Sequence, residues 1–96
     1  MITEIVSLYI KNNENDLFEK AFAEASEIIA SMNGYLKHEL QKCVEVSNKY
    51  ILLVEWNSIG DHINGFRNHK IYGDWKNLLH HFYEPFPIVE HYVKIF

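Results

Sequence analysis

The sequence predicts an α+β fold in which helices cover one face of a four-stranded antiparallel sheet, in the order β-α-β-β-α-α-β. Three observations support this prediction. Apolar residues recur at helical spacing within 16–32 and 70–82. Four other runs have the residue types of strands, and polar or proline-containing segments separate the elements. The chain has 96 residues, of which 48% are hydrophobic, so we expect a single domain over 1–96.

The first two elements are a strand and a long helix. Residues 2–10 are rich in β-branched and aromatic side chains and run into the polar cluster 11–15. Between 16 and 32, one broad helical face is apolar, formed by Leu17, Phe18, Ala21, Phe22, Ala25, Ile28, Ile29 and Met32. We expect Asn13 or Asn15 to cap this helix and Gly34, after Asn33, to end it in the left-handed conformation.

A hairpin and two further helices follow. Residues 35–45 and 50–56 are the expected strands, joined by the turn 47–49. Asn57 or Ser58 is expected to cap a short helix that ends near Asn68, with Asp61 in a position typical of a capping box. A helix over 70–82 stops before two prolines, and 86–96 forms the fourth strand.

The strands are apolar on both faces, although the helices can cover only one. Ile5, Val6, Leu8, Tyr9 and Ile10 occupy both faces of the first strand, and the run 51–54 does the same in the third. The uncovered face therefore needs a partner, and a second copy is the simplest one for so short a chain. We expect a homodimer in which the open sheet faces pack together.

Composition narrows the class of protein. Nine Lys and Arg residues against thirteen Asp and Glu give a formal charge of −4, which argues against a nucleic-acid surface. No apolar run is long enough to cross a membrane, and the first residues lack the pattern of a signal peptide. Cys43 is the single cysteine, which suits a reducing compartment. We therefore expect a cytoplasmic protein that binds neither nucleic acid nor membrane.

His62 is the main candidate for a catalytic role. It lies at the edge of the apolar stripe formed by Ile59, Ile63 and Phe66, so its imidazole is expected to face the space between helices and sheet. An inward imidazole can act as a general base near neutral pH. The alternative is a core histidine hydrogen-bonded to a backbone carbonyl.

Aromatic side chains cluster in the same half of the chain and predict either a substrate pocket or ordinary core packing. The candidates are Trp56, Phe66, Tyr72, Trp75 and Phe82. Arg67 follows Phe66 and can bind a carboxylate or phenolate, with a solvent-facing role or an ion pair as the alternative.

The remaining histidines give no metal site. His80 and His81 are adjacent, so on a helix they diverge by about 100° and cannot easily share a metal ion. Both are expected to project outside the apolar stripe of their helix. The direction of His91 depends on strand register, which the sequence leaves open. We therefore predict no metal ligands.

The segment 54–92, VEW followed by NSIGDHINGFRNHKIYGDWKNLLHHFYEPFPIVEHY, resembles the antibiotic biosynthesis monooxygenase (ABM) domain family. The resemblance extends in length and element order over nearly the whole chain. It implies a ferredoxin-like fold whose sheets join in a dimeric α+β barrel, with a ligand site between sheet and helices. One branch of the family oxygenates polycyclic phenols or quinols without a metal, flavin or haem.

The resemblance leads to the hypothesis of a cofactor-independent monooxygenase that acts on a small aromatic, phenolic or quinol substrate, with His62 as its base. The alternative is a non-catalytic ligand-binding or assembly module of the same fold. Another branch degrades haem with an Asn on the first strand and a Trp and a His on the helical segment. This sequence has Ser7, Gly65 and Trp75-Lys76 at the comparable places. Haem binding is therefore disfavoured, with His80 as an offset ligand left open.

Overall fold

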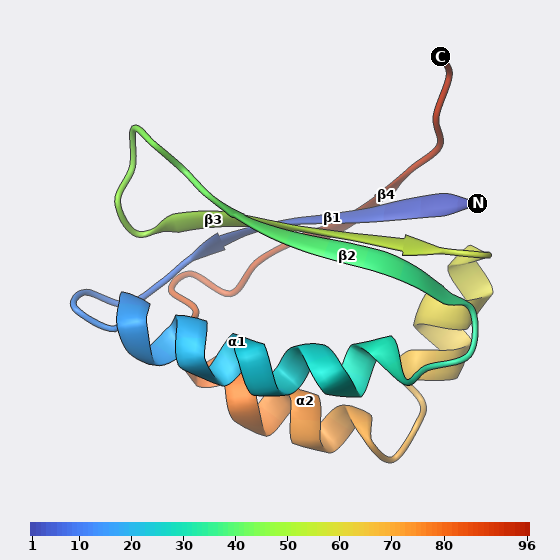
Figure 1. Ribbon diagram of the computed structural model, residues 1–96, viewed down its shortest axis with the longest axis horizontal. Coiled ribbons are helices and arrows are strands. Elements are labelled where there is room, and N and C mark those ends of the chain that lie inside the picture. The colour runs from blue at the N-terminus through green and yellow to red at the C-terminus, as the bar shows by residue number, and fades with distance from the viewer.

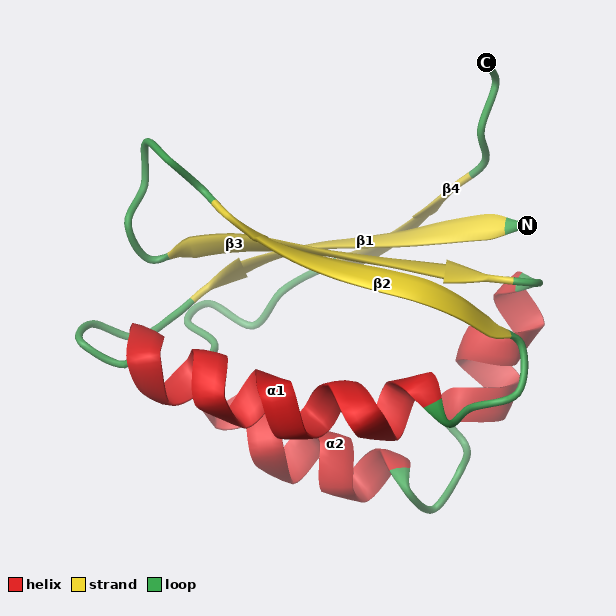
Figure 2. Ribbon diagram, viewed as in Figure 1, coloured by secondary structure: helices red, strands yellow, loops and turns green.

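The computed structural model describes residues 1–96 and has the predicted order of elements, in a ferredoxin-like α+β fold (Figure 1). Its strands are β1 (Ile2–Tyr9), β2 (Tyr35–Lys42), β3 (Lys49–Trp56) and β4 (Val89–Tyr92). Its helices are α1 (Asn15–Ala30), the π-helix η1 (Asp61–Phe66), α2 (Tyr72–Leu79) and the 3-10 helix η2 (His80–Phe82). Figure 2 shows the sheet as one layer and the helices as a second layer on one of its faces.

The sheet has the order β2-β3-β1-β4, with every neighbouring pair antiparallel. β1 is therefore a central strand, paired with β3 along its whole length and with β4 near its start. Within β1, the alternation of a strand turns Glu4, Val6 and Leu8 toward the helices and buries them. Ile5 and Tyr9 point to the outer face, which no helix covers.

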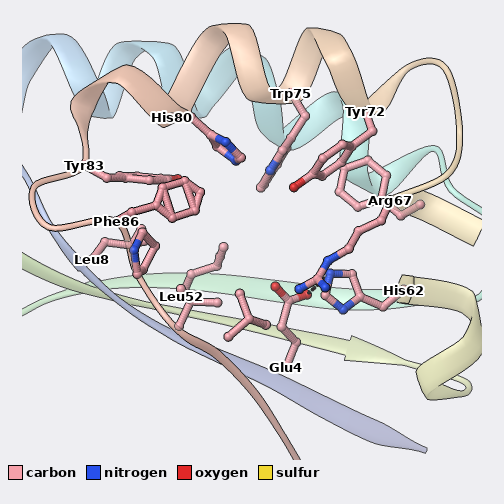
Figure 3. Close-up of a pocket in the computed structure, with 14 residues that line it drawn as sticks. Glu4, Leu8, Leu52, His62, Arg67, Tyr72, Trp75, His80, Tyr83 and Phe86 are labelled. Atoms are coloured by element: carbon pink, nitrogen blue, oxygen red, sulfur yellow. Dashed lines mark ion pairs between the residues drawn. The ribbon is translucent and has the colours of Figure 1, made fainter. Parts of the chain in front are cut away.

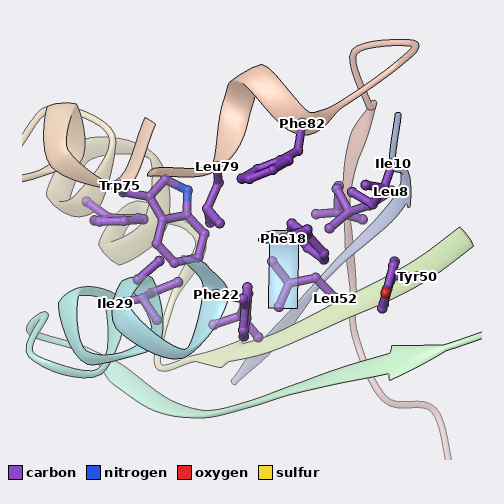
Figure 4. Packing of buried hydrophobic residues seen from close by; sticks show 14 of the residues in the cluster. Leu8, Ile10, Phe18, Phe22, Ile29, Tyr50, Leu52, Trp75, Leu79 and Phe82 are labelled. Atoms are coloured by element: carbon purple, nitrogen blue, oxygen red, sulfur yellow. The ribbon is translucent and has the colours of Figure 1, made fainter. Parts of the chain in front are cut away.

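A single apolar core fills the space between the two layers (Figure 4). Phe18, Phe22, Ala25 and Ile29 of α1 are buried as expected, whereas Leu17, also assigned to this face, lies in the first turn of α1 and is 60% exposed. Phe18 contacts Tyr50, with 5.0 Å between ring centroids, so α1 is packed directly on β3. Burial of this face holds α1 on the sheet.

The ends of the elements differ in part from expectation. α1 ends at Ala30 with Ser31 in right-handed geometry, so Gly34, whose φ is 82°, lies in the turn before β2 and does not itself end the helix as expected. Ser58 accepts a hydrogen bond from the backbone N–H of Asp61 over 3.2 Å. Neither Asn13 nor Asn15 caps α1: Glu14 precedes the helix without a side-chain cap. The Asn15 amide instead donates to the carbonyl of Ser47.

The elements in the last third of the chain are shorter and less regular than predicted. The expected helix to Asn68 is π-helical, with the N–H of Arg67 donating to the carbonyl of His62 over 3.0 Å. The expected helix over 70–82 begins at Tyr72 and changes to 3-10 geometry at His80. β4 is limited to Val89–Tyr92, because only these residues pair with β1.

Candidate functional site

A cavity of about 450 Å³ lies between the sheet and the helical layer (Figure 3). β1 and β3 form its floor, η1 and α2 form one wall, and the segment after η2 closes the other side. Its polar lining residues are Glu4, His62, Arg67, Tyr72, His80 and Tyr83. Its apolar lining residues are Val6, Leu8, Leu52, Phe66, Trp75, Phe86, Pro87 and Val89.

The structure brings five of the seven predicted site residues to this cavity. They are His62, Phe66, Arg67, Tyr72 and Trp75. Trp56 and Phe82 do not line it. The Trp56 side chain is 0% exposed below His62, and Phe82 packs against Phe18 with 5.8 Å between centroids. These two residues belong to the core that supports the cavity.

Glu4 is the residue that sequence reasoning missed. It is 6% exposed, lines the cavity, and lies on the same inward face of β1 as Val6 and Leu8. A carboxylate at an inward position of an otherwise apolar strand is unusual, because burial of an unpaired charge is costly. Glu4 lies two residues before Val6 and therefore on the same face of the predicted strand. This spacing is the sequence signal that could have identified Glu4 as an inward carboxylate.

Glu4 accepts a hydrogen bond from the indole N–H of Trp56, with 3.0 Å between Nε1 and Oε1. Its other oxygen, Oε2, makes no hydrogen bond with the protein and is not sealed from the cavity. Burial raises the pKa of Glu4 from 4.5 to about 6, against the opposing effects of the Trp56 hydrogen bond and the Arg67 charge. Glu4 can therefore change protonation state near neutral pH.

His62 is 3% exposed and is held between two ionisable neighbours. Its Nε2 lies 3.4 Å from Oε1 of Glu4, and its Nδ1 lies 2.9 Å from Nε2 of His91. Burial, with the charges of Arg67 and His91, lowers the pKa of His62 to about 3. His62 is therefore neutral at physiological pH, and its Nδ1 already has a hydrogen-bond partner in His91.

Strand register determines the direction of His91. His91 lies directly opposite Glu4 in the β1–β4 pairing, so both side chains project from the helix-covered face of the sheet. His91 remains partly exposed, and burial together with Arg67 lowers its pKa. The register thus places a third ionisable side chain beside the buried pair.

His80 departs from the prediction that it projects outside the apolar stripe. It lines the cavity and contacts the ring of Phe86, with 5.1 Å between centroids. The change from α-helix to 3-10 helix at this residue alters the direction of the side chain relative to a continuous α-helix. Figure 3 shows His80 above the cavity, across from Glu4.

The wall formed by η1, α2 and the residues between them presents hydrogen-bond donors to the cavity. Trp75 is 6% exposed, and its indole N–H has no protein partner. The Tyr72 hydroxyl is likewise without a protein partner, and burial raises its pKa. Arg67 forms no ion pair and extends over Glu4 and His62 in Figure 3. A ligand with oxygen acceptors on one side and an acidic hydrogen on the other matches this arrangement.

No group of three or more His, Cys, Asp and Glu side chains has the geometry to hold a metal ion. None of the helices combines the length and apolar character that crossing a lipid bilayer requires.

Comparisons with known proteins agree on one family. A model of the family described as antibiotic biosynthesis monooxygenase matches residues 1–78. The uncharacterized protein YczJ of Bacillus subtilis (strain 168) is 50% identical over 95 residues, covering 99% of this chain and 100% of YczJ. A crystal structure of a protein from Bordetella bronchiseptica, assigned to the same family, has a TM-score of 0.94 at 25% identity. The alignment covers 99% of this chain and 97% of the Bordetella chain.

A more distant structure carries a described activity. SnoaB from Streptomyces nogalater, a cofactor-independent oxygenase, has a TM-score of 0.76 at 16% identity, covering 95% of this chain and 87% of SnoaB. At this identity the similarity shows a shared fold.

Proposed function

The chain belongs to the antibiotic biosynthesis monooxygenase family, and we propose that it is a cofactor-independent monooxygenase acting on a small phenolic or quinol substrate in the cavity between sheet and helices. The observation that carries the proposal is the Glu4–His62 pair at the floor of a largely apolar cavity. The activity described for SnoaB, which shares the fold, supports this reaction class.

The Glu4–His62 pair is the proposed proton acceptor. Oε2 of Glu4 is the basic atom that reaches the cavity, while His62 contacts the other oxygen of the same carboxylate. A carboxyl group with a pKa of about 6 is ionised at pH 7, so it can accept a proton from a phenol hydroxyl. His62, the base expected from the sequence, thus acts together with Glu4.

The reaction needs no electrons from outside the substrate. Loss of the phenol proton to Glu4 leaves an electron-rich phenolate, which reduces O₂ directly in the water-poor cavity. One oxygen atom of O₂ enters the ring as a carbonyl and the other leaves as water, so phenol and O₂ become quinone and water. The ring loses four electrons and O₂ gains them.

The other lining residues have proposed binding roles. Phe66 and Trp75 form apolar surfaces for the aromatic ring, and their own rings meet edge to face with 5.5 Å between centroids. Arg67 stabilises the negative charge that develops on the substrate oxygen. The Tyr72 hydroxyl is a hydrogen-bond partner for a second oxygen of the substrate.

The proposal is tested by oxygen uptake in chelator-treated buffer with a panel of quinols and polycyclic phenols. We expect substrate-dependent uptake by the wild type and a loss of about 100-fold or more in Glu4→Gln and in His62→Ala. His81→Gln, on an exposed residue outside the cavity, is the matched control. Circular dichroism checks that each variant is folded.

The experiment tests the assigned proton acceptor and separates an enzyme from a ligand-binding module. Uptake that persists in both variants contradicts the Glu4–His62 pair as acceptor. Saturable binding of the same phenols without oxygen uptake contradicts the enzyme and favours the ligand-binding module.

We also propose that the protein is a homodimer that packs through the outer face of the sheet. Ile5, Tyr9, Ile51 and Leu53 are half-buried on this face although no helix covers it. Beyond it, the C-terminal residues Val93, Ile95 and Phe96 are exposed. Apolar surface of this extent is typical of an interface between subunits. With Cys43 as the single cysteine, a cytoplasmic location is the matching proposal.

A further inference from the structure

We propose that His80 and Tyr83 form a second polar subsite of the cavity, which binds a neutral oxygen atom of the substrate. The inference rests on the proposed function and narrows it, because the reacting hydroxyl is assigned to Glu4, at the other end of the cavity in Figure 3. The expected substrate is an aromatic diol or hydroxyketone that carries oxygen atoms at both ends of its ring system.

A single turn of 3-10 helix brings the two side chains together. His80 begins η2 and Tyr83 follows its last residue, with the N–H of Tyr83 donating to the carbonyl of His80 over 3.3 Å. Side chains three residues apart in such a helix project from the same side of the turn. The two rings accordingly lie 5.6 Å apart between centroids, and both line the cavity.

Backbone hydrogen bonds hold this turn against the end of β1. The N–H of Lys11 donates to the carbonyl of Phe82 over 3.0 Å, and the N–H of Glu84 donates to the carbonyl of Tyr9 over 2.8 Å. Tyr83 lies between these two contacts. The subsite is therefore fixed relative to β1 before a ligand binds, which lowers the entropic cost of binding.

The polar atoms of both side chains are available to a ligand. Neither the Tyr83 hydroxyl nor the His80 imidazole makes a hydrogen bond with the protein, and neither is sealed from the cavity. The rings of Phe86 and Tyr72 lie beside the imidazole, with centroids 5.1 Å and 6.1 Å from it. A hydrogen bond made in such largely apolar surroundings is stronger than the same bond in water.

The charges around the pair favour a neutral oxygen over a carboxylate. Burial, with the effects of Tyr72 and Glu4, raises the pKa of Tyr83 well above its usual value, so its hydroxyl stays protonated. Burial, with the charge of Lys76, lowers the pKa of His80, so its imidazole is neutral at pH 7. A ligand carboxylate beside Tyr83 would be opposed by the same burial and by the charge of Glu4.

A hydroxyl group of the ligand matches both partners. It accepts a hydrogen bond from the Tyr83 O–H and donates one to the unprotonated nitrogen of His80. A carbonyl oxygen also fits, because it can accept from Tyr83 and from the N–H of His80. A methyl group in the same place leaves both side chains without a partner, and this loss is the source of the expected selectivity.

Anaerobic titration calorimetry tests the subsite separately from any oxygenase activity. The probes are 2,6-dihydroxynaphthalene and 1,5-dihydroxynaphthalene, each compared with the methylnaphthol in which a methyl group replaces one hydroxyl. We expect the wild type to bind at least one diol about tenfold or more tightly than its methyl counterpart. In Tyr83→Phe and in His80→Phe, this preference should fall to about twofold or less.

Two matched substitutions serve as controls. His81→Phe repeats the His80 substitution at the next residue, which is exposed and does not line the cavity. Tyr35→Phe matches Tyr83→Phe, since the Tyr35 hydroxyl contacts Nδ1 of His38 and is likewise outside the cavity lining. Both controls should keep the wild-type preference for the diol, and circular dichroism checks that every variant is folded.

Three results would overturn the proposal. The first is a diol preference that survives in both Tyr83→Phe and His80→Phe. The second is a wild type that binds diol and methylnaphthol equally or binds neither. The third is tighter binding of 6-hydroxy-2-naphthoic acid than of 2,6-dihydroxynaphthalene, which contradicts a neutral oxygen. Absence of oxygen uptake counts against the proposed function alone, because the binding measurements are made without O₂.

Discussion

The indole of Trp56 lies nearly parallel to the imidazole of His62, with 5.4 Å between ring centroids and 19° between ring planes. The same indole donates its N–H to Glu4. Trp56 is fully buried and does not line the cavity, so its role is to hold the side chains of Glu4 and His62 in position. A residue that looked like a candidate for ligand contact instead supports the site.

Replacing Trp56 by Phe keeps an aromatic ring under His62 but removes the N–H that stabilises the Glu4 carboxylate. Because that hydrogen bond lowers the pKa of Glu4, we expect the pKa to rise above about 6 in Trp56→Phe. A carbon-13 NMR titration of the Glu4 carboxyl measures this change directly. An unchanged or lower pKa contradicts the assigned role of the indole.

Replacing Glu4 by Gln is expected to stabilise the fold at high pH while removing the proposed acceptor. The pKa of Glu4 is raised on folding, from 4.5 to about 6, so the folded state binds more protons in this window. Its contribution to the free energy of unfolding is therefore complete below pH 4.5 and is lost as the pH rises through 6. A rise of this size corresponds to about 2 kcal/mol.

Urea unfolding of the wild type and Glu4→Gln at pH 4 and pH 8 tests this expectation. The advantage of the variant should grow by about 2 kcal/mol from pH 4 to pH 8. His62 is present in both proteins, so its own titration largely cancels in the comparison. A difference that does not depend on pH indicates that burial does not raise the pKa of Glu4.

Replacing Gly34 by Ala should destabilise the protein strongly. Gly34 has φ of 82°, and a Cβ atom there would collide with the side chain of Asp61. Asp61 is itself held by the Ser58 hydroxyl, so it cannot move aside without loss of that contact. We expect a loss of about 2 kcal/mol or more in the free energy of unfolding.

Gly73→Ala is the matched control for this substitution. Gly73 lies in α2, and an added Cβ would meet no atom within 4 Å. The higher helix propensity of Ala predicts a gain of up to about 1 kcal/mol. Equal effects of the two changes, measured by urea unfolding, would show that the close approach at Gly34 does not matter.

Replacing Leu53 by Lys should disrupt the proposed homodimer. Leu53 lies on the outer face of β3, directly paired with Ile5 of β1. A charge here would be buried between the two sheets, and burial of an unpaired charge is costly. Sedimentation equilibrium is expected to show a wild-type dimer and a monomeric variant. Leu17→Lys, an exposed position on α1 at the other layer, should remain a dimer.

Much of the fold was predictable because local patterns dictate it. The apolar face between Phe18 and Ile29 predicts a helix packed on a sheet, and Gly34 allows the left-handed backbone of the turn between that helix and β2. The Ser58–Asp61 pair marks the next helix start for an equally local reason. The inward direction of His62 also follows from its place beside an apolar stripe.

The composition of the site depended on long-range structure. α2 changes to 3-10 geometry at His80, and this residue lines the cavity, neither of which residue spacing reveals. Glu4 and His91 become neighbours only through the register of β1 and β4, which lie at opposite ends of the chain.

The sequence by itself therefore determined the order of elements, the helix-covered and open faces of the sheet, and the inward position of His62, because these depend on periodicity and turn chemistry. Only the tertiary structure brings the side chains of Glu4, His62 and His91 next to one another. Their contacts and their shifted pKa values arise from strand pairing and burial, which no local segment contains.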